Sequence, residues 1–263
     1  MKLEFIYHPA KTGLQLHPML FVHGMSHAAW CWKEEFIPYF TALGYDCYAL
    51  SLRGHGASEG AELLRWSSIK EYEQDVEWAI RKIGKLPIVF GHSMGGFILQ
   101  KYILKHDILP AYIGVAAVPN TGMLRGAMNL LLSYPWAFLM GNLTLSTLPF
   151  VQSEAIVRDM CLTPGASTEK VREVQSRLQG ESYRAFLDMV LLNHHAARKV
   201  DTPMLHLHTS LDKVLFEPEM RACAEKFGAD YHQFSNVGHD MFLDDNWREV
   251  AYYISTWLTK KGL

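Results

Sequence analysis

Short apolar runs alternate with longer stretches of helical periodicity along most of this chain. The run at residues 86–90 is short, apolar and partly β-branched, with a proline near its start, as is typical of a buried parallel strand. The runs lie at residues 18–22, 46–50, 86–90, 112–118, 204–208 and 231–234. This alternation predicts an α/β protein with a mainly parallel sheet covered by helices on both faces.

Three of the longer stretches carry apolar side chains at the spacing of one helix face. The first covers residues 32–43 and stops at Gly44, a residue type that commonly ends helices. The second covers residues 69–83 and follows Ser68, which has the spacing of a capping box with the glutamate three residues later. The third covers residues 247–258 near the end of the chain. We expect these helices to pack on the sheet.

The alternation breaks between residues 119 and 198. Because this stretch lies between two core strands, it predicts an inserted helical cap, or lid, above a core of residues 1–118 and 199–263. Residues 126–153 carry no charged side chain and are long enough to span a bilayer, but prolines and glycines interrupt them. We therefore expect a lid-like segment rather than a membrane span, and transient contact with a membrane surface stays open.

Composition places the chain among ordinary globular proteins. It has 263 residues, of which 49% are hydrophobic, and a formal net charge of −2, so nothing favours nucleic acid as a partner. Its first residues lack the apolar core of a signal peptide, and its 4 cysteines lack C-x-x-C spacing. We expect a cytoplasmic protein with reduced thiols.

One serine lies where a catalytic nucleophile is found in many α/β enzymes. Residues 88–99 read IVFGHSMGGFIL, and Ser93 lies between Gly91 and Gly95 at the predicted junction of a strand and a helix. Glycines at these positions let the strand and the helix approach closely. The N-terminus of a helix offers unpaired N–H groups that favour developing negative charge. We therefore predict that Ser93 is a nucleophile.

A serine nucleophile needs an imidazole base and a carboxylate that orients it. Asp212 lies in the short loop after the strand at residues 204–208, and His239 lies in the loop after the strand at residues 231–234. The carboxyl ends of parallel strands meet at one edge of the sheet, so these loops converge on the loop of Ser93. The sequence therefore predicts a triad of Ser93, Asp212 and His239.

The motifs around these residues resemble those of the α/β-hydrolase-fold serine hydrolases, in particular esterases, lysophospholipases and monoacylglycerol lipases, over nearly the whole chain. The matching motifs are FVHGM (residues 21–25), RGHGAS (53–58), GHSMGG (91–96), LDKV (211–214) and GHDMFLD (238–244). The resemblance implies an oxyanion hole formed by the backbone N–H groups of Met25 and Met94. Subfamilies with an aspartate nucleophile are excluded by Ser93. Hydroxynitrile lyases differ because they carry a threonine where this chain has Gly24.

The expected activity is hydrolysis of a small-molecule ester with a medium or long apolar acyl chain, because the insertion is rich in large apolar residues. Ser26, Trp136 and Met140 are candidates for the substrate pocket. No cofactor and no metal are expected: His23 and His27 are four residues apart, but no helix is expected there and the chain has no H-E-x-x-H motif. The oligomeric state is left open.

Two alternatives remain at this point. The same scaffold supports cofactor-free C–C bond hydrolysis or oxygenation of an aromatic ring, and turnover of such rings without ester hydrolysis would identify that class. A ligand receptor that keeps a vestigial triad is the second alternative, and stoichiometric binding with very slow turnover would identify it.

Overall fold

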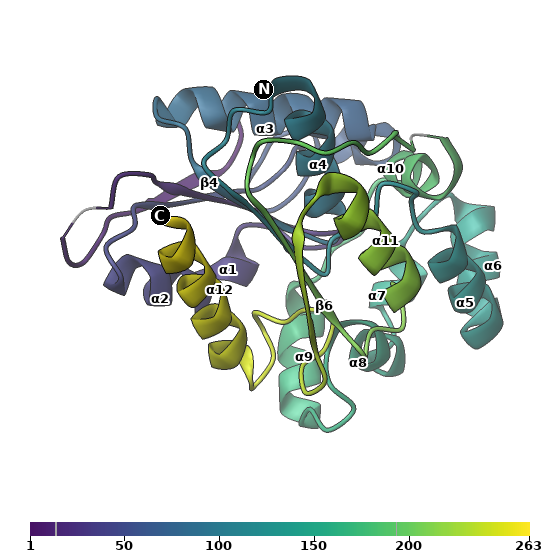
Figure 1. Ribbon diagram of the computed structural model, residues 1–263. Helices are drawn as coiled ribbons and strands as arrows, with labels where there is room; N and C mark the ends of the chain where they lie inside the picture. The colour runs from purple at the N-terminus through teal and green to yellow at the C-terminus, as the bar shows by residue number, and fades with distance from the viewer. Residues whose placement is uncertain (14, 193) are drawn as a thin grey trace.

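A seven-stranded sheet forms the centre of the molecule, and helices cover both of its faces (Figure 1). The computed structural model describes residues 1–13, 15–192 and 194–263. The strands are β1 (Phe5–His8), β2 (Met19–Val22), β3 (Cys47–Leu50), β4 (Ile88–His92), β5 (Tyr112–Val115), β6 (Met204–Thr209) and β7 (Asp230–Phe234). Their order is β1-β3-β2-β4-β5-β6-β7, and only β1 runs antiparallel to its neighbour. The predicted α/β-hydrolase fold is confirmed.

Two hydrophobic cores lie on opposite faces of the sheet because successive strand residues point to opposite sides. Phe21 and Phe90 belong to one core, and their neighbours Leu20 and Val89 belong to the other. The first core includes α1 (Trp30–Lys33), α2 (Phe36–Ala42) and α12 (Trp247–Lys261). The second includes α3 (Ile69–Ile83), α4 (Met94–His106) and α11 (Glu217–Phe227), and the 3₁₀ helix η1 (Ala61–Trp66) precedes α3.

Two local expectations were wrong. The predicted helix over residues 32–43 is divided into α1 and α2, because Pro38 has no N–H with which to bond the carbonyl of Glu34 across the junction. The strand predicted over residues 112–118 ends at Val115, since Ala116 adopts a φ of 43° that no strand continues through. The capping box of Ser68 is confirmed, and α3 begins at the next residue.

The segment between β5 and β6 is helical. Its helices are α5 (Leu124–Ser133), α6 (Pro135–Thr144), α7 (Leu148–Val151), α8 (Glu154–Cys161), α9 (Thr168–Arg177) and α10 (Tyr183–Leu187), followed by a π-helical turn, η2 (Asp188–Leu192). Figure 1 shows α5, α6 and α10 gathered at one side of the sheet. Within the described ranges, every helix is too short or too polar to cross a lipid bilayer. Below, residues 119–198 are called the insertion.

Candidate active site

Ser93 lies on the sharp turn between the central strand β4 and helix α4. Its φ of 46° and ψ of −113° are strained values for a residue with a side chain, and strain of this kind is concentrated at functional sites. A Cβ on Gly91 would lie 2.6 Å from the Cα of Gly96, and a Cβ on Gly95 would lie 2.5 Å from the carbonyl oxygen of His23. The glycines therefore permit the close approach that the sequence predicted, and the turn places Ser93 at the start of the helix.

Asp212 lies in the loop that follows β6, and two backbone groups fix its carboxylate. The N–H groups of Val214 and Leu215 donate to its Oδ1 at 2.8 and 2.9 Å. Its other oxygen, Oδ2, lies 2.6 Å from Nδ1 of His239. The side chain of Asp212 has no exposed surface. Because a carboxylate oxygen can only accept, the proton of the His239 ring is held on Nδ1, and Nε2 is left as the basic atom.

His239 lies in the loop between β7 and α12. Burial by itself would lower the pKa of this imidazole, but the charge and hydrogen bond of Asp212 outweigh burial and raise the pKa above its ordinary value. An orienting carboxylate with a raised imidazole pKa is the environment that a general base needs near neutral pH. The structure thus brings together Asp212 and His239.

Ser93 and His239 line the same cavity, which holds about 750 Å³ of empty space, part of it open to solvent. Most of its wall is apolar and comes from the insertion. Among the insertion residues on this wall are Met123, Leu130, Phe150, Val151, Met160 and Leu178. Ser93 and His239 therefore share a largely apolar cavity.

The pocket residues predicted from the sequence were partly wrong. Ser26 lines the cavity beside Ser93. Trp136 and Met140 instead line a separate outer groove, and Trp136 is 72% exposed. The physical reason is the direction of α6: it packs inward through Gly141 and Phe138, which leaves Trp136 and Met140 on the side of the outer groove. The sequence showed that residues 126–153 are apolar, but it did not show which of their side chains face the cavity.

The loop of residues 23–27 closes the cavity next to Ser93. Met25 lines the cavity, and in the described part of the chain neither its N–H nor that of Met94 donates to another backbone group. Ser26 has a φ of 65°, which is unusual for a residue with a side chain. Backbone N–H groups of this kind can stabilise a tetrahedral oxyanion, so the oxyanion hole of Met25 and Met94 stays a prediction.

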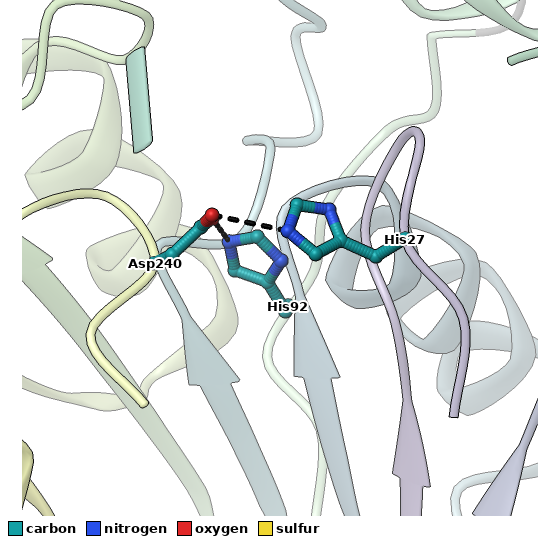
Figure 2. Close-up of side chains that lie close together, drawn as sticks. All are labelled: His27, His92 and Asp240. Carbon is teal, nitrogen blue, oxygen red and sulfur yellow. Dashed lines mark hydrogen bonds and ion pairs between the residues drawn. The ribbon is translucent and has the colours of Figure 1, made fainter. Parts of the chain in front are cut away.

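A second buried cluster joins the 23–27 loop, the strand that precedes Ser93 and the loop of His239. Figure 2 shows the Asp240 carboxylate facing both His27 and His92, with a contact drawn to each ring. Its Oδ2 lies 3.0 Å from Nε2 of His27, and its Oδ1 lies 3.2 Å from Nε2 of His92. The second contact is close but poorly aligned, so neither ring nitrogen of His92 has a hydrogen-bond partner among the described residues. Burial alone would raise the pKa of Asp240, but His27 and His92 hold it well below its usual range.

These three side chains are also the group in the described ranges that could hold a metal ion, since their ligand atoms lie within 4.8 Å of one another. The ring of His27 is already engaged on both sides, because its Nδ1 lies 2.7 Å from the carbonyl oxygen of Met25. The carboxylate therefore has a partner without an ion. We interpret the cluster as an ion pair that connects the 23–27 loop to the loop of His239.

Sequence analysis missed the buried carboxylate of Glu181 in the insertion. Glu181 contacts Ser26, His55 and Tyr72, which lie at least 109 positions away along the chain. No local pattern around Glu181 marks it, because its significance depends on contacts between the insertion and the core. A single buried glutamate preceding a helix looks like an ordinary polar residue in the sequence.

Comparisons with known proteins show which family the chain belongs to. Protein ABHD8 of Bos taurus is 30% identical over 78 residues, which cover 29% of this chain and only 18% of that protein. Thus the chain spans less than a fifth of that relative's length.

Solved structures match over nearly the whole chain. The monoacylglycerol lipase of Paleococcus ferrophilus has a TM-score of 0.74 at 20% identity and covers 99% of this chain and 100% of its own. A thermophilic esterase of Thermogutta terrifontis has a TM-score of 0.71 at 18% identity and covers 98% and 94%. At these identities the likeness shows the fold. The model of the alpha/beta hydrolase family matches residues 19–251, and so this chain belongs to the alpha/beta hydrolase family.

Proposed function

We propose that this protein is a serine hydrolase that cleaves carboxylic esters with medium or long apolar acyl chains. The observation that carries the proposal is the strained Ser93, which opens into an apolar cavity shared with His239, while Asp212 holds the imidazole from behind.

The proposed reaction has two steps. Nε2 of His239 takes the proton of Ser93 as its Oγ attacks the ester carbonyl, and the N–H groups of Met25 and Met94 stabilise the oxyanion. The alcohol leaves with the proton from His239, and an acyl-enzyme remains on Ser93. Water then gives its proton to His239, attacks the acyl carbonyl and releases the acid. Asp212 stabilises the imidazolium that forms in each step.

Chain-length preference follows from the apolar wall of the cavity. Each buried CH₂ contributes about 0.8 kcal/mol, so six further carbons add up to about 5 kcal/mol. We expect kcat/KM for p-nitrophenyl esters to rise by up to about 10³-fold between acetate and octanoate. Initial rates over acyl chains of two to sixteen carbons test this. A preference for acetate would contradict the apolar pocket, and absence of ester turnover at every length would instead favour C–C bond chemistry or a receptor.

We also propose that the outer face of α5 and α6 contacts lipid surfaces, where apolar esters gather. Leu132, Trp136 and Leu143 are 79%, 72% and 70% exposed, and residues 126–153 carry no charge. Exposed apolar area on this scale, with a tryptophan, is typical of interaction surfaces at lipid interfaces. The uncharged composition fits zwitterionic rather than anionic lipid.

Cosedimentation with phosphatidylcholine vesicles tests this contact. The protein should carry Ser93→Ala, so that hydrolysis does not alter the vesicles. We expect the further double change Leu132→Glu and Leu143→Glu to reduce the bound fraction at least about tenfold, whereas Leu16→Glu, at a leucine that is 78% exposed elsewhere, should not. Equal binding by both variants, no binding by the parent protein, or a dimer formed through this face would refute the proposal.

A further inference from the structure

Glu181 contributes a carboxylate from the insertion to the interior of the core. Its side chain has no exposed surface. Its Oε1 accepts from the Tyr72 hydroxyl at 2.7 Å and from the Ser182 N–H at 2.6 Å. Its Oε2 accepts from Nε2 of His55 at 3.0 Å and from the N–H of Ser26 at 3.2 Å. A carboxylate buried with a full set of donors has one fixed position, and here that position is against the 23–27 loop.

The charge on this carboxylate is matched by His55. The ring of His55 faces oxygen atoms on both sides, the carbonyl of Arg53 at 3.0 Å and Glu181 at 3.0 Å, so both nitrogens must carry protons. Burial would lower the pKa of His55, but Glu181 raises it overall, and burial would raise the pKa of Glu181, but His55 lowers it. The pair is therefore charged in the interior.

The other titratable groups around His55 are consistent with this assignment. The His23 ring, 4.9 Å away, has its pKa lowered to about 3, chiefly by burial, and accepts from the N–H of Leu52 as a neutral ring. Tyr72 lies 5.9 Å from His55 and has its pKa raised, chiefly by burial. Asp75 adds negative charge that favours the charged imidazole. Neither neighbouring ring therefore competes for the positive charge.

The insertion holds Ser26 from both sides of its backbone. The N–H of Ser26 donates to Glu181, and its carbonyl accepts from the N–H of Gln179 at 3.0 Å. These two bonds fix the residue whose φ is 65°, a conformation that a serine adopts only when its surroundings impose it. The side chain of Gln179 also bonds Gly54 and Gly56, so the segment itself is anchored.

Met25 directly precedes Ser26, so the position of its N–H depends on this contact. We propose that Glu181 is a positioning residue that holds the 23–27 loop so that the N–H of Met25 points at the substrate carbonyl. The proposal rests on the ester hydrolysis proposed above. It makes the oxyanion hole depend on the insertion, since the carboxylate that orders the loop lies 155 positions further along the chain.

The same carboxylate is connected to the substrate cavity. The N–H of Glu181 donates to Oγ1 of Thr147 at 2.6 Å, and Thr147 lines the cavity. A displacement of the insertion by a bound acyl chain would therefore reach the 23–27 loop through one hydrogen-bonded chain. Through the hydrogen bond between Glu181 and Thr147, we expect the insertion to affect kcat as well as substrate binding.

The variant Glu181→Gln tests the proposal because it keeps the size of the side chain and removes its charge. We expect kcat for p-nitrophenyl octanoate to fall about 10- to 100-fold, somewhat less than the loss of a complete oxyanion donor, with KM changed less than about threefold. The affinity of an alkylboronic acid, which forms a tetrahedral adduct on Ser93, should fall by a similar factor. Glu181→Asp, which keeps the charge but is too short to reach both partners, should show the same loss of kcat.

Two control variants separate positioning from stability. Tyr72→Phe removes another hydrogen bond to the same carboxylate but leaves Ser26 in contact, so it should lower Tm and preserve kcat. Glu154→Gln changes an exposed glutamate of the insertion that pairs with Arg172, and it should alter neither property. If Glu181→Gln and Glu181→Asp lower Tm as Tyr72→Phe does but keep kcat and boronate affinity, the inference is wrong. Wild-type protein that neither hydrolyses esters nor binds the boronate would instead overturn the proposed function itself.

Discussion

Replacing Ser93 by alanine is expected to lower kcat/KM for p-nitrophenyl octanoate by about 10⁴-fold or more. The substitution removes the only atom of this residue that forms the acyl-enzyme bond. The Cβ remains, so the strained turn at φ 46° and the packing against Gly91 and Gly95 are unchanged. Initial rates measured at equal concentrations of folded protein test the prediction, and circular dichroism checks that both proteins are folded.

The matched control for this experiment is Ser176→Ala. Ser176 is an exposed serine on α9 whose hydroxyl donates to the Glu173 carbonyl in its own helix. It should keep the wild-type rate. If Ser93→Ala retained a tenth or more of the activity, a different group would have to be the nucleophile.

Asp212→Asn is expected to lower kcat by about 10⁴-fold without unfolding the protein. An asparagine can turn its NH₂ group toward Nδ1 of His239, which places the ring proton on Nε2 and removes the base. The backbone N–H groups of Val214 and Leu215 can still bond the amide oxygen, so the loop keeps its shape. The exposed Asp245 lies in the loop after His239, and Asp245→Asn serves as the control.

The pH dependence of the same variants reports on His239. Only the neutral imidazole accepts the proton of Ser93, so kcat/KM should rise with pH and reach a plateau. Because Asp212 raises the pKa of His239, the midpoint for the wild-type enzyme should lie above the ordinary value of 6.5. The residual activity of Asp212→Asn should have a lower midpoint, since the charge that stabilises the imidazolium is gone. An unchanged midpoint would show that Asp212 does not orient this histidine.

The order of the candidate triad could be predicted from the sequence because the sheet is parallel. Each of Ser93, Asp212 and His239 follows a short strand of the sheet, and parallel strands end at a common edge. The sharp turn at Ser93 could also be predicted from Gly91 and Gly95, because the close approach of a strand and a helix depends on the residues at the turn itself. Features that depend on the order of strands and on backbone sterics at a turn can thus be predicted from the sequence.

Features that depend on contacts between distant segments could not be predicted in this way. The apolar character of residues 126–153 was visible, but the direction of α6, which turns Trp136 and Met140 outward, depends on how Gly141 packs. Glu181 has no local signature, because its partners Ser26 and His55 belong to the other end of the chain. The edge strand β1 was missed for a different reason: its 4 residues are only partly buried and show little alternation.

The central claim is that Ser93 is the nucleophile of an ester hydrolase, and covalent labelling tests it most directly. The intact protein would be treated with an alkyl fluorophosphonate, in which the serine oxygen displaces fluoride and forms a stable P–O bond. Mass spectrometry with peptide mapping should find one adduct per chain, on Ser93, with none in Ser93→Ala. Labelling of another residue, or no labelling of a protein that still hydrolyses esters, would contradict the account.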